Sequence, residues 1–373
     1  MLSSSLCTGE NATITDFNMR KRSYILHVFA WICALTLGAA LSTAYISTYI
    51  SPVEHWIPSF FGLYFVPLVV INLLLLLLLA LRRSNAAWCV LIALLPTILY
   101  IDLFVRWGPL DNLPREGVSF RLATYNVCNF QGYSNKDRQT AMQAISRTLA
   151  EENVDIVCMQ EFYFADSSVV FNIFSQYPYH VLRPQNADAG RYFGNAIFSK
   201  YPIQNHGISY FPSGGRHVLY ADFVLHERPF RVYTTHLESN KISLTALADR
   251  LYKHPDASEE LLAAHRRIRD AFQGRARQID QLSRQLSEVS IPYVLCGDFN
   301  DTPVSYTYHH IQKQLHDSFR EAGKGLGASF RYLWPTLRID YIFYDDAFQA
   351  YGHRTLRLPY SDHYPVITDL ILL

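Results

Sequence analysis

The sequence predicts an α/β domain preceded by three transmembrane helices. Apolar residues are concentrated in three long stretches before Trp107, and hydrophobic residues make up 50% of the 373 residues. The remainder alternates short strand-like apolar runs with segments of helical spacing. We therefore expect a membrane region at residues 1–107, a linker at 108–117 and a domain with one sizeable core at 118–373.

The three apolar stretches are Tyr24 to Ile50, Ile57 to Leu81 and Ala86 to Val105. Each is near or above the roughly 20 residues that a helix needs to cross a bilayer. A buried helix of a soluble protein is the alternative for any one of them, but three in succession favour membrane helices. Pro67 and Pro96 fall inside the second and third stretches. Membrane helices tolerate such prolines.

Positive charges predict the orientation of these helices. Basic residues at 20–22 precede the first stretch, and Arg82 and Arg83 separate the second from the third. The loop around Glu54 contains no Lys or Arg. By the positive-inside rule, we expect an integral protein of the plasma (inner) membrane whose C-terminal domain lies on the extracytoplasmic side.

The charge balance of residues 118–373 gives no electrostatic sign of nucleic-acid binding. In this range, 26 Lys and Arg balance 26 Asp and Glu. A local basic strip contains Arg266, Arg267, Arg269, Arg275 and Arg277, for which we expect the solvated face of a long helix.

The three cysteines of this range, Cys128, Cys158 and Cys296, form no CxxC pair and no disulfide framework. Cys158 and Cys296 lie in apolar strand-like runs. We expect both to be small buried hydrophobic side chains.

A polar sequence at the end of one apolar run marks the expected centre of the site. The run Tyr293 to Cys296 continues as Gly-Asp-Phe-Asn-Asp. Asp298 and Asn300 are two residues apart, so their side chains leave an extended backbone on the same face. Such oxygen and amide groups suit a hard divalent cation and the water it activates. A simple polar turn is the alternative for this stretch alone.

Other predicted strands carry polar residues at their ends in the same way. The residues are Asn126 in 120–127, Glu161 after 155–159, His236 after 230–235, Asp340 in 338–344, and Asp362 with His363 before 366–373. Further strands are expected at 179–182, 195–199, 208–211 and 219–225, and helices at 137–152, 241–287 with a break near Pro255, and 305–315.

Six short pieces, in this order, resemble the endonuclease/exonuclease/phosphatase superfamily of DNase I-like proteins. They are Tyr-Asn-Val, Gln-Glu, Thr-His-Leu, Gly-Asp-Phe-Asn, Arg-Ile-Asp-Tyr-Ile and Ser-Asp-His-Tyr-Pro. The resemblance covers residues 118–373. It implies a four-layer α/β sandwich that cleaves phosphoester bonds with Mg²⁺ or Mn²⁺, and the transmembrane helices are additional to the family's usual domain.

The resemblance also implies a role for each matching residue. Glu161, Asn126 and Asp362 resemble metal-side residues, with Glu161 the main ligand. Asp298 looks like the base that orients or deprotonates water, and Asn300 steadies the phosphate. His363, held and charged by Asp340, would contact the phosphate, with His236 as a second contact or acid. Asn195, in Gly-Asn-Ala-Ile-Phe, is expected to touch the substrate.

Together these features predict a membrane-anchored, metal-dependent phosphodiesterase that uses water as the nucleophile. Its expected partners are the lipid bilayer and a phosphodiester, and the sequence points to no protein partner. The membrane helices suit a phospholipid headgroup, whereas a local basic groove would suit a nucleic acid, so both substrate classes stay open. The alternative is a membrane-anchored binding or scaffold protein that keeps the fold without catalysis.

Overall fold

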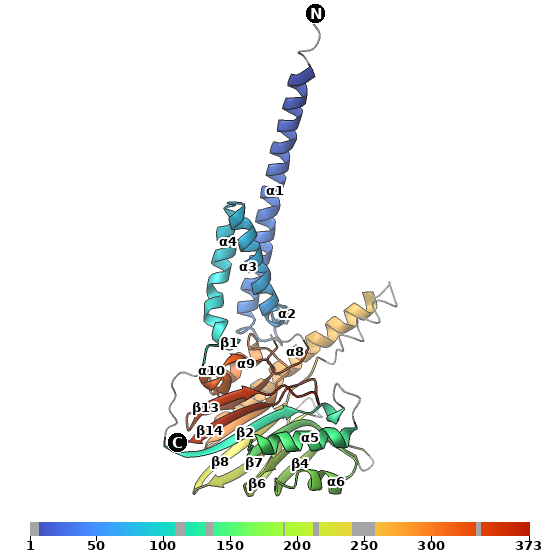
Figure 1. Ribbon diagram of the computed structural model, residues 1–373, viewed down its shortest axis with the longest axis vertical. Coiled ribbons are helices and arrows are strands. Elements are labelled where there is room, and N and C mark those ends of the chain that lie inside the picture. Colours follow the sequence, from blue (N-terminus) through green and yellow to red (C-terminus); the bar gives the residue numbers. More distant parts are fainter. Residues whose placement is uncertain are drawn as a thin grey trace, which may run out of the picture.

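Two six-stranded sheets packed face to face form the centre of the domain, and helices cover both outer faces (Figure 1). The structure is a computed structural model that describes residues 7–108, 116–131, 137–188, 191–211, 216–240, 258–332 and 337–373. Its helix, sheet, sheet, helix layering confirms the predicted four-layer α/β sandwich.

The first sheet has the strand order β13-β14-β2-β3-β5-β4. Its strands are β2 (Val118–Asn126), β3 (Ile156–Phe164), β4 (Tyr179–Asp188), β5 (Arg191–Ser199), β13 (Phe348–Thr355) and β14 (Val366–Leu372). Helices α5 (Arg138–Glu151) and α6 (Ser167–Ile173) pack on its outer face. β2 and β3 run parallel, because the chain crosses between them through α5.

The second sheet has the order β10-β12-β9-β8-β7-β6. Its strands are β6 (Ile203–Tyr210), β7 (His217–Leu225), β8 (Arg228–His236), β9 (Tyr293–Asp298), β10 (His316–Asp317) and β12 (Asp340–Tyr344). The outer face is covered by α8 (Ser258–Ser287) and α9 (Tyr306–Gln312), while α10 (Ser318–Ala322) follows β10.

The central strands are apolar on both faces because each face meets a core. In β2, Phe120 and Leu122 belong to the core between the two sheets, whereas Ala123 and Tyr125 belong to the core under α5. This two-residue alternation follows from the pleat of an extended chain.

Gln160 of β3 joins the two sheets through hydrogen bonds inside the core. Its fully buried amide donates to Thr124 Oγ1 of β2 at 3.0 Å and to Thr234 Oγ1 of β8 at 2.9 Å. A buried polar group must be paired to be tolerated. These bonds therefore fix the lateral position of one sheet on the other near the ends of their strands.

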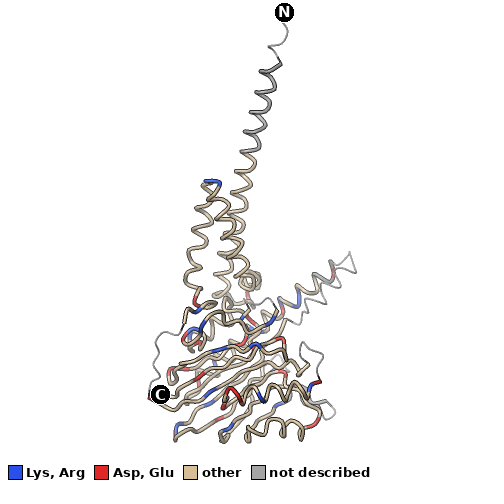
Figure 2. The backbone as a smooth tube through the Cα atoms, in the orientation of Figure 1, with Lys and Arg blue, Asp and Glu red and all other residues tan. Residues whose placement is uncertain are grey.

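The N-terminal apolar region forms a stalk of helices that stands on the domain (Figure 1). It contains α1 (Cys7–Ile46), α2 (Ile57–Leu63), α3 (Phe65–Leu81), α4 (Ala86–Leu94) and the 3₁₀ helix η1 (Leu95–Leu103). Two segments are long and apolar enough to cross a bilayer, 24–46 and 86–103, and α2 with α3 makes a third if it counts as one span. Figure 2 shows a stalk with little charge except at the α3–α4 turn remote from the domain.

The second predicted span is not one straight helix, which corrects the sequence-based expectation. The axes of α2 and α3 differ by 71° at a break next to Tyr64. Pro67 lacks the N–H that would bond to the carbonyl of Leu63, and its ring crowds that carbonyl, so the helix breaks here. Pro96 acts similarly in the third span, where α4 ends and η1 begins.

The stalk is attached to the domain by a short strand pair and by side-chain contacts. β1 (Val105–Arg106), just after η1, pairs antiparallel with β11 (Gly325–Leu326). The buried Arg338 donates to the Leu103 carbonyl at 3.0 Å and to Asp317 at 2.6 Å. The chain just before the expected linker is thus already bound to the domain, and residues 109–115 of that linker lie outside the described residues.

Two further expectations are corrected by the fold. β3 does not stop before Glu161 but continues to Phe164 through a bulge. Arg275 does not lie on a solvated helix face: it is fully buried, with Nε 3.1 Å from Asp301 Oδ2. The helical character expected for 241–257 falls outside the described residues. Cys158 and Cys296 are free and buried, as predicted.

Gly297 is the position in β9 where a side chain is excluded. Its φ is +139°, and a Cβ would lie 2.0 Å from the Thr235 carbonyl oxygen. We predict that Gly297→Ala lowers the free energy of unfolding by at least about 2 kcal/mol. Thermal unfolding of the full-length protein in detergent, followed by tryptophan fluorescence, measures this loss.

Gly325→Ala is the matched control because Gly325 also has a positive φ, +75°, but open space around its Cβ position. Its cost should be only about 1 kcal/mol, from the left-handed backbone alone. Equal costs for the two variants would contradict the steric explanation.

Candidate functional site

The strands bring four predicted site residues to one end of the seam between the sheets. Asn126, His236, Asp298 and Asp340 each lie on the side of their strand that faces the other sheet, in phase with core residues. The register places His236 opposite Asp298 in the parallel β8–β9 pair and Asp340 opposite Asp298 in the β9–β12 pair. The apolar face of each strand therefore continues into polar groups that converge.

Glu161 reaches the same place because of the bulge in β3. Strict alternation would turn Glu161 away from the seam, toward the core that holds Met159. The pairing with β5 shifts between Met159 and Phe162, and Glu161 has a φ of +51°. The extra residue at a bulge re-aims its side chain. Glu161 Oε1 consequently lies 3.3 Å from Asn126 Nδ2.

Asp298 lies at the centre of the group, and both of its carboxylate oxygens receive hydrogen bonds. Asn126 Nδ2 donates to Oδ2 at 2.9 Å, and the backbone N–H of Asn300 donates to Oδ1 at 2.8 Å. The φ of Asn300 is +53°, which turns the chain back so that this N–H can reach Asp298. Asp298 is 1% exposed, so its orientation is fixed by these donors.

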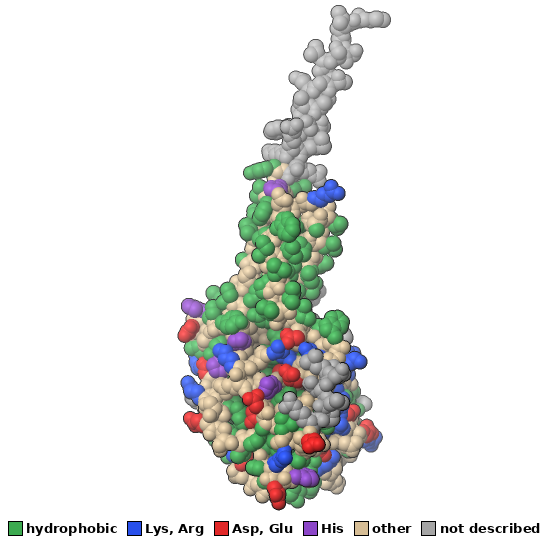
Figure 3. All heavy atoms as spheres, turned by 90° about the vertical axis from the view of Figure 1, so that its left-hand side faces the viewer, with side chains coloured by type: hydrophobic (Ala, Val, Ile, Leu, Met, Phe, Trp, Pro, Cys, Tyr) green, Lys and Arg blue, Asp and Glu red, His purple; other side chains and the backbone are tan. Residues whose placement is uncertain are grey.

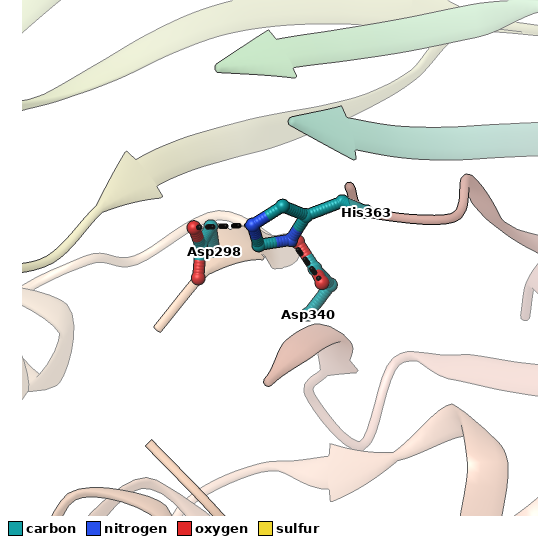
Figure 4. A group of neighbouring side chains, drawn as sticks. All are labelled: Asp298, Asp340 and His363. Carbon is teal, nitrogen blue, oxygen red and sulfur yellow. Dashed lines mark hydrogen bonds and ion pairs between the residues drawn. The ribbon is translucent and has the colours of Figure 1, made fainter. Parts of the chain in front are cut away.

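His363 lies between two carboxylates, one from each of two neighbouring strands (Figure 4). Its Nδ1 is 2.8 Å from Asp340 Oδ2, and its Nε2 is 3.7 Å from Asp298 Oδ2. The edge of the Phe330 ring packs against the imidazole, with ring centres 4.9 Å apart. The ring is thereby held with Nε2 directed toward the centre of the site.

These two carboxylates keep His363 in its charged form. Burial alone would lower the pKa of His363, but Asp340 and Asp298 outweigh burial and raise that pKa to about 10. His363 is therefore an imidazolium at neutral pH. A fixed positive charge at this position can stabilise negative charge that develops on a bound anion.

His236 differs from His363 in charge although it also lies between acids. Its Nε2 is 3.7 Å from Glu161 Oε1 and 3.6 Å from Asp298 Oδ2, and neither ring nitrogen has a hydrogen-bond partner among the described residues. Complete burial, with Arg216 and His363 nearby, lowers the pKa of His236 well below its ordinary value. A neutral His236 can donate one hydrogen bond to a ligand, but it is a poor choice for a general acid.

Burial outweighs the positive charge of His363 at the carboxylates of Glu161 and Asp298. Burial raises the pKa of Glu161, and the nearby Asp298 and Asp362 raise it further, although Asn126 and His363 oppose them. Burial likewise raises the pKa of Asp298 to about 6. Crowded carboxylates with shifted pKa values form a donor set that fits a hard divalent cation.

The tightest group of acids and histidine among the described residues is not the best cation site. Ligand atoms of Asp298, Asp340 and His363 lie within 4.8 Å of one another. However, the Nδ1 of His363 is engaged with Asp340 and its ring is protonated, so it has no lone pair for a metal. Glu161, with Asn126 and Asp362 beside it, fits a cation better.

The remaining predicted residues lie around this centre. Asn300 donates from Nδ2 to the Leu237 carbonyl at 3.2 Å, and Asp362 affects the pKa of Glu161. Asn195, on β5 near the bulge, donates to the His217 carbonyl at 3.3 Å, and its Oδ1 has no partner among the described residues. No described hydrogen bond joins Asn195 to the central group.

Two serines that position the site were not predicted from the sequence. Ser361 Oγ donates to the Asn126 carbonyl at 2.7 Å and accepts from the His363 N–H, so it links two site residues. Ser329 Oγ accepts from the N–H of Asp340 at 3.0 Å. Ser361, next to Asp362, carried a turn signal that could have indicated it. Ser329, far from any motif, carried none.

The comparison with protein families agrees with this geometry. The profile of the Endonuclease/Exonuclease/phosphatase family matches residues 123–363, which contain every residue of the site. This chain belongs to that family. Residues 26–104 match a second profile, described as a domain of unknown function. No curated protein sequence matches the chain at a significant level.

Solved structures of this family share the fold of the domain. The endonuclease/exonuclease/phosphatase from Bacteroides vulgatus aligns with a TM-score of 0.52 at 18% identity, covering 69% of this chain and 100% of that chain. The human Nocturnin catalytic domain aligns with a TM-score of 0.49 at 17% identity, covering 68% and 94%. At 18% identity, the likeness to the Bacteroides vulgatus structure establishes the fold alone.

The charge of His363 gives a pH-dependent prediction. Asp340→Asn should lower the pKa of His363 from about 10, because the carboxylate bonded to its Nδ1 is removed. Since the folded-state pKa exceeds the unfolded value of about 6.5, protonation of His363 stabilises the fold fully below pH 6.5. That contribution is lost as the pH rises toward 10.

Histidine-selective NMR titration of the full-length protein in detergent measures this pKa directly. Asp346→Asn is the matched control, because Asp346 pairs with the more exposed His316 and should leave His363 unchanged. An unchanged His363 titration in Asp340→Asn would contradict the assigned electrostatics.

Proposed function

We propose that this protein is a membrane-anchored, metal-dependent phosphodiesterase in which water attacks the phosphorus atom. The convergence of Asn126, Glu161, His236, Asp298 and His363 at one end of the sheet seam carries the proposal. The site combines the fixed positive charge of His363, the buried carboxylate of Asp298 and a group around Glu161 that can bind a divalent cation. Hydrolysis of a phosphoester needs these three elements.

Asp298 acts as the base for the attacking water. Its pKa of about 6 is high for an aspartate, so it accepts a proton more readily than an exposed carboxylate while staying ionised at neutral pH. Asn126 and the Asn300 N–H hold both of its oxygens. A base fixed in this way can orient water along one line toward the substrate.

His363 and His236 bind the phosphate oxygens. The imidazolium of His363 presents Nε2–H beside Asp298, where it neutralises charge as the phosphorus gains a fifth oxygen. Asp340 maintains that charge from the opposite side of the ring. His236, neutral and without a described partner, adds one N–H donor.

Glu161, Asn126 and Asp362 would hold a divalent cation, Mg²⁺ or Mn²⁺. Such an ion, when bound, offsets negative charge on the phosphate and its leaving group. The raised pKa of Glu161 in the absence of a cation supports this placement. Binding of the cation should return Glu161 to its fully ionised form.

The stalk supports placement of the site at a membrane surface. Its apolar helices end directly on the domain, where β1 pairs with β11 and Asp102 pairs with Arg320. Arg82 and Arg83 lie at the turn remote from the domain (Figure 2). By the positive-inside rule, these arginines support an extracytoplasmic position for the domain. The substrate is a phosphodiester, either a phospholipid headgroup or a nucleic acid.

Metal-dependent hydrolysis by the full-length protein in detergent tests the function. Plasmid DNA, RNA, sphingomyelin and inositol phosphates are incubated with Mg²⁺ or Mn²⁺, and with EDTA as the metal-free arm. Asp298→Asn should lower turnover of the cleaved substrate by roughly 10²- to 10⁴-fold, because the base is lost with little change in shape. Glu161→Gln should raise the metal concentration needed for half-maximal rate.

Arg284→Ala is the control, since Arg284 is exposed on α8 and contacts no site residue. Unfolding temperatures of all variants separate loss of chemistry from loss of fold. Full turnover in Asp298→Asn would refute the assigned base. Cleavage of no substrate class by the wild type, with metal bound, would favour a binding or scaffold role.

A further inference from the structure

A polar cavity lies between α10, β11 and the edge strand β13, away from the site described above. It has a volume of about 260 Å³ and is lined by Phe319, Lys324, Leu326, Gly327, Ala328, His353, Arg354, Thr355 and Arg357. Its charged lining residues, Lys324, Arg354 and Arg357, all carry a positive charge. None of the predicted catalytic or metal-binding residues lines it.

Two buried polar atoms of the cavity's lining residues have no hydrogen-bond partner among the described residues. They are Nε2 of His353 and Oγ1 of Thr355. A buried donor without a partner lowers the stability of the fold by on the order of 1–3 kcal/mol. Such atoms are therefore rare unless a ligand or a water molecule forms a hydrogen bond with them. Two of them on one short strand segment point to a bound group that accepts hydrogen bonds.

The hydroxyls behind His353 occupy one of its two ring nitrogens. His353 Nδ1 lies 2.9 Å from Ser318 Oγ and 3.2 Å from Thr368 Oγ1, and Thr368 Oγ1 donates to Ser318 Oγ at 3.1 Å. Nε2 is left as the ring nitrogen without a partner among the described residues. Burial lowers the pKa of His353 to about 3, so the ring stays neutral.

The charges around the cavity favour an anion over a neutral acceptor. Arg354 is largely compensated, because it pairs with Glu152 at 2.6 Å and with Asp369 at 3.3 Å. Lys324 is exposed and has no ion-pair partner in the described part of the chain. Arg357 adds a further cation to the lining.

The cavity also lies where the stalk meets the domain. Leu326, one of its lining residues, pairs with Val105 two residues beyond the end of η1. Trp107, which directly follows β1, is 90% exposed, and Trp is enriched at membrane–water boundaries. On the face shown in Figure 3, Lys and Arg side chains lie below the apolar stalk together with Asp and Glu side chains.

We propose that this cavity binds a phosphate group, supplied by the headgroup of an anionic phospholipid in the bilayer around the stalk. The phosphate oxygens accept from His353 Nε2–H and from the Thr355 hydroxyl, while Lys324 neutralises their charge. Phosphate binding itself is independent of the proposed catalysis. The lipid as its source rests on the proposed membrane placement of the stalk.

Hydrogen–deuterium exchange of the full-length protein in nanodiscs tests the proposal. Exchange of segments 323–328 and 353–357 is compared in phosphatidylcholine discs, in discs with increasing phosphatidylglycerol, and in phosphatidylcholine discs with added inorganic phosphate. We expect phosphatidylglycerol to slow exchange of both segments. Lys324→Glu should raise the phosphatidylglycerol content needed for half-maximal protection by roughly fivefold or more.

Two further variants make the result specific. Thr355→Val removes the hydroxyl at nearly constant volume and should also weaken protection. Arg277→Glu, an exposed charge reversal on α8, should leave protection unchanged. Equal exchange in all three lipid and phosphate conditions, or equal effects of Lys324→Glu and Arg277→Glu, would overturn the site. Protection by inorganic phosphate alone would overturn the lipid as its source.

Discussion

The face-to-face packing of the two sheets is the constraint on which the rest of this structure depends. Each central strand turns alternate residues toward the opposite sheet, and this face is apolar until the strand end. There the same phase delivers Asn126, His236, Asp298 and Asp340. A site built in this way is as rigid as the core below it, because moving one carboxylate would require one sheet to slide on the other.

Burial of these acids makes the site chemically useful and energetically costly. Carboxylates removed from water need donors or opposite charges, and the protein supplies both unevenly. His363 and Asp340 form a direct pair, so that histidine is charged, whereas His236 lies without a direct bond and is neutral. The two imidazoles thus differ in protonation state, because nearby carboxylates outweigh burial at His363, whereas burial prevails at His236.

The stalk and the domain are joined through charged groups that are themselves buried. Arg338 bonds to Asp317 and to the last carbonyl of η1, and two residues later the chain supplies Asp340 to the site. Removing one partner of such a buried pair typically costs about 3–5 kcal/mol, because the other charge is left unpaired. The stalk and the candidate site therefore share one rigid segment.

The sequence by itself determined the class of the fold and the apolar stalk, and it named most residues of the candidate site. Asn126, Asp298 and Asp340 were expected because each lies in or at the end of an apolar run, within a piece that resembles the family. The break at Pro67 and the buried Arg275 depended on local backbone geometry and on distant partners, and periodicity could not reveal them.

Only the tertiary structure decided which polar residues meet and in which charge state. The direction of the Glu161 side chain depends on a bulge in β3 where it pairs with β5. The roles of Ser329 and Ser361 depend on chain segments that are brought together in space. The charge of His363 depends on carboxylates from β9 and β12. A residue's type and spacing are local properties of the chain, whereas a pKa and a hydrogen-bond partner are properties of its folded surroundings.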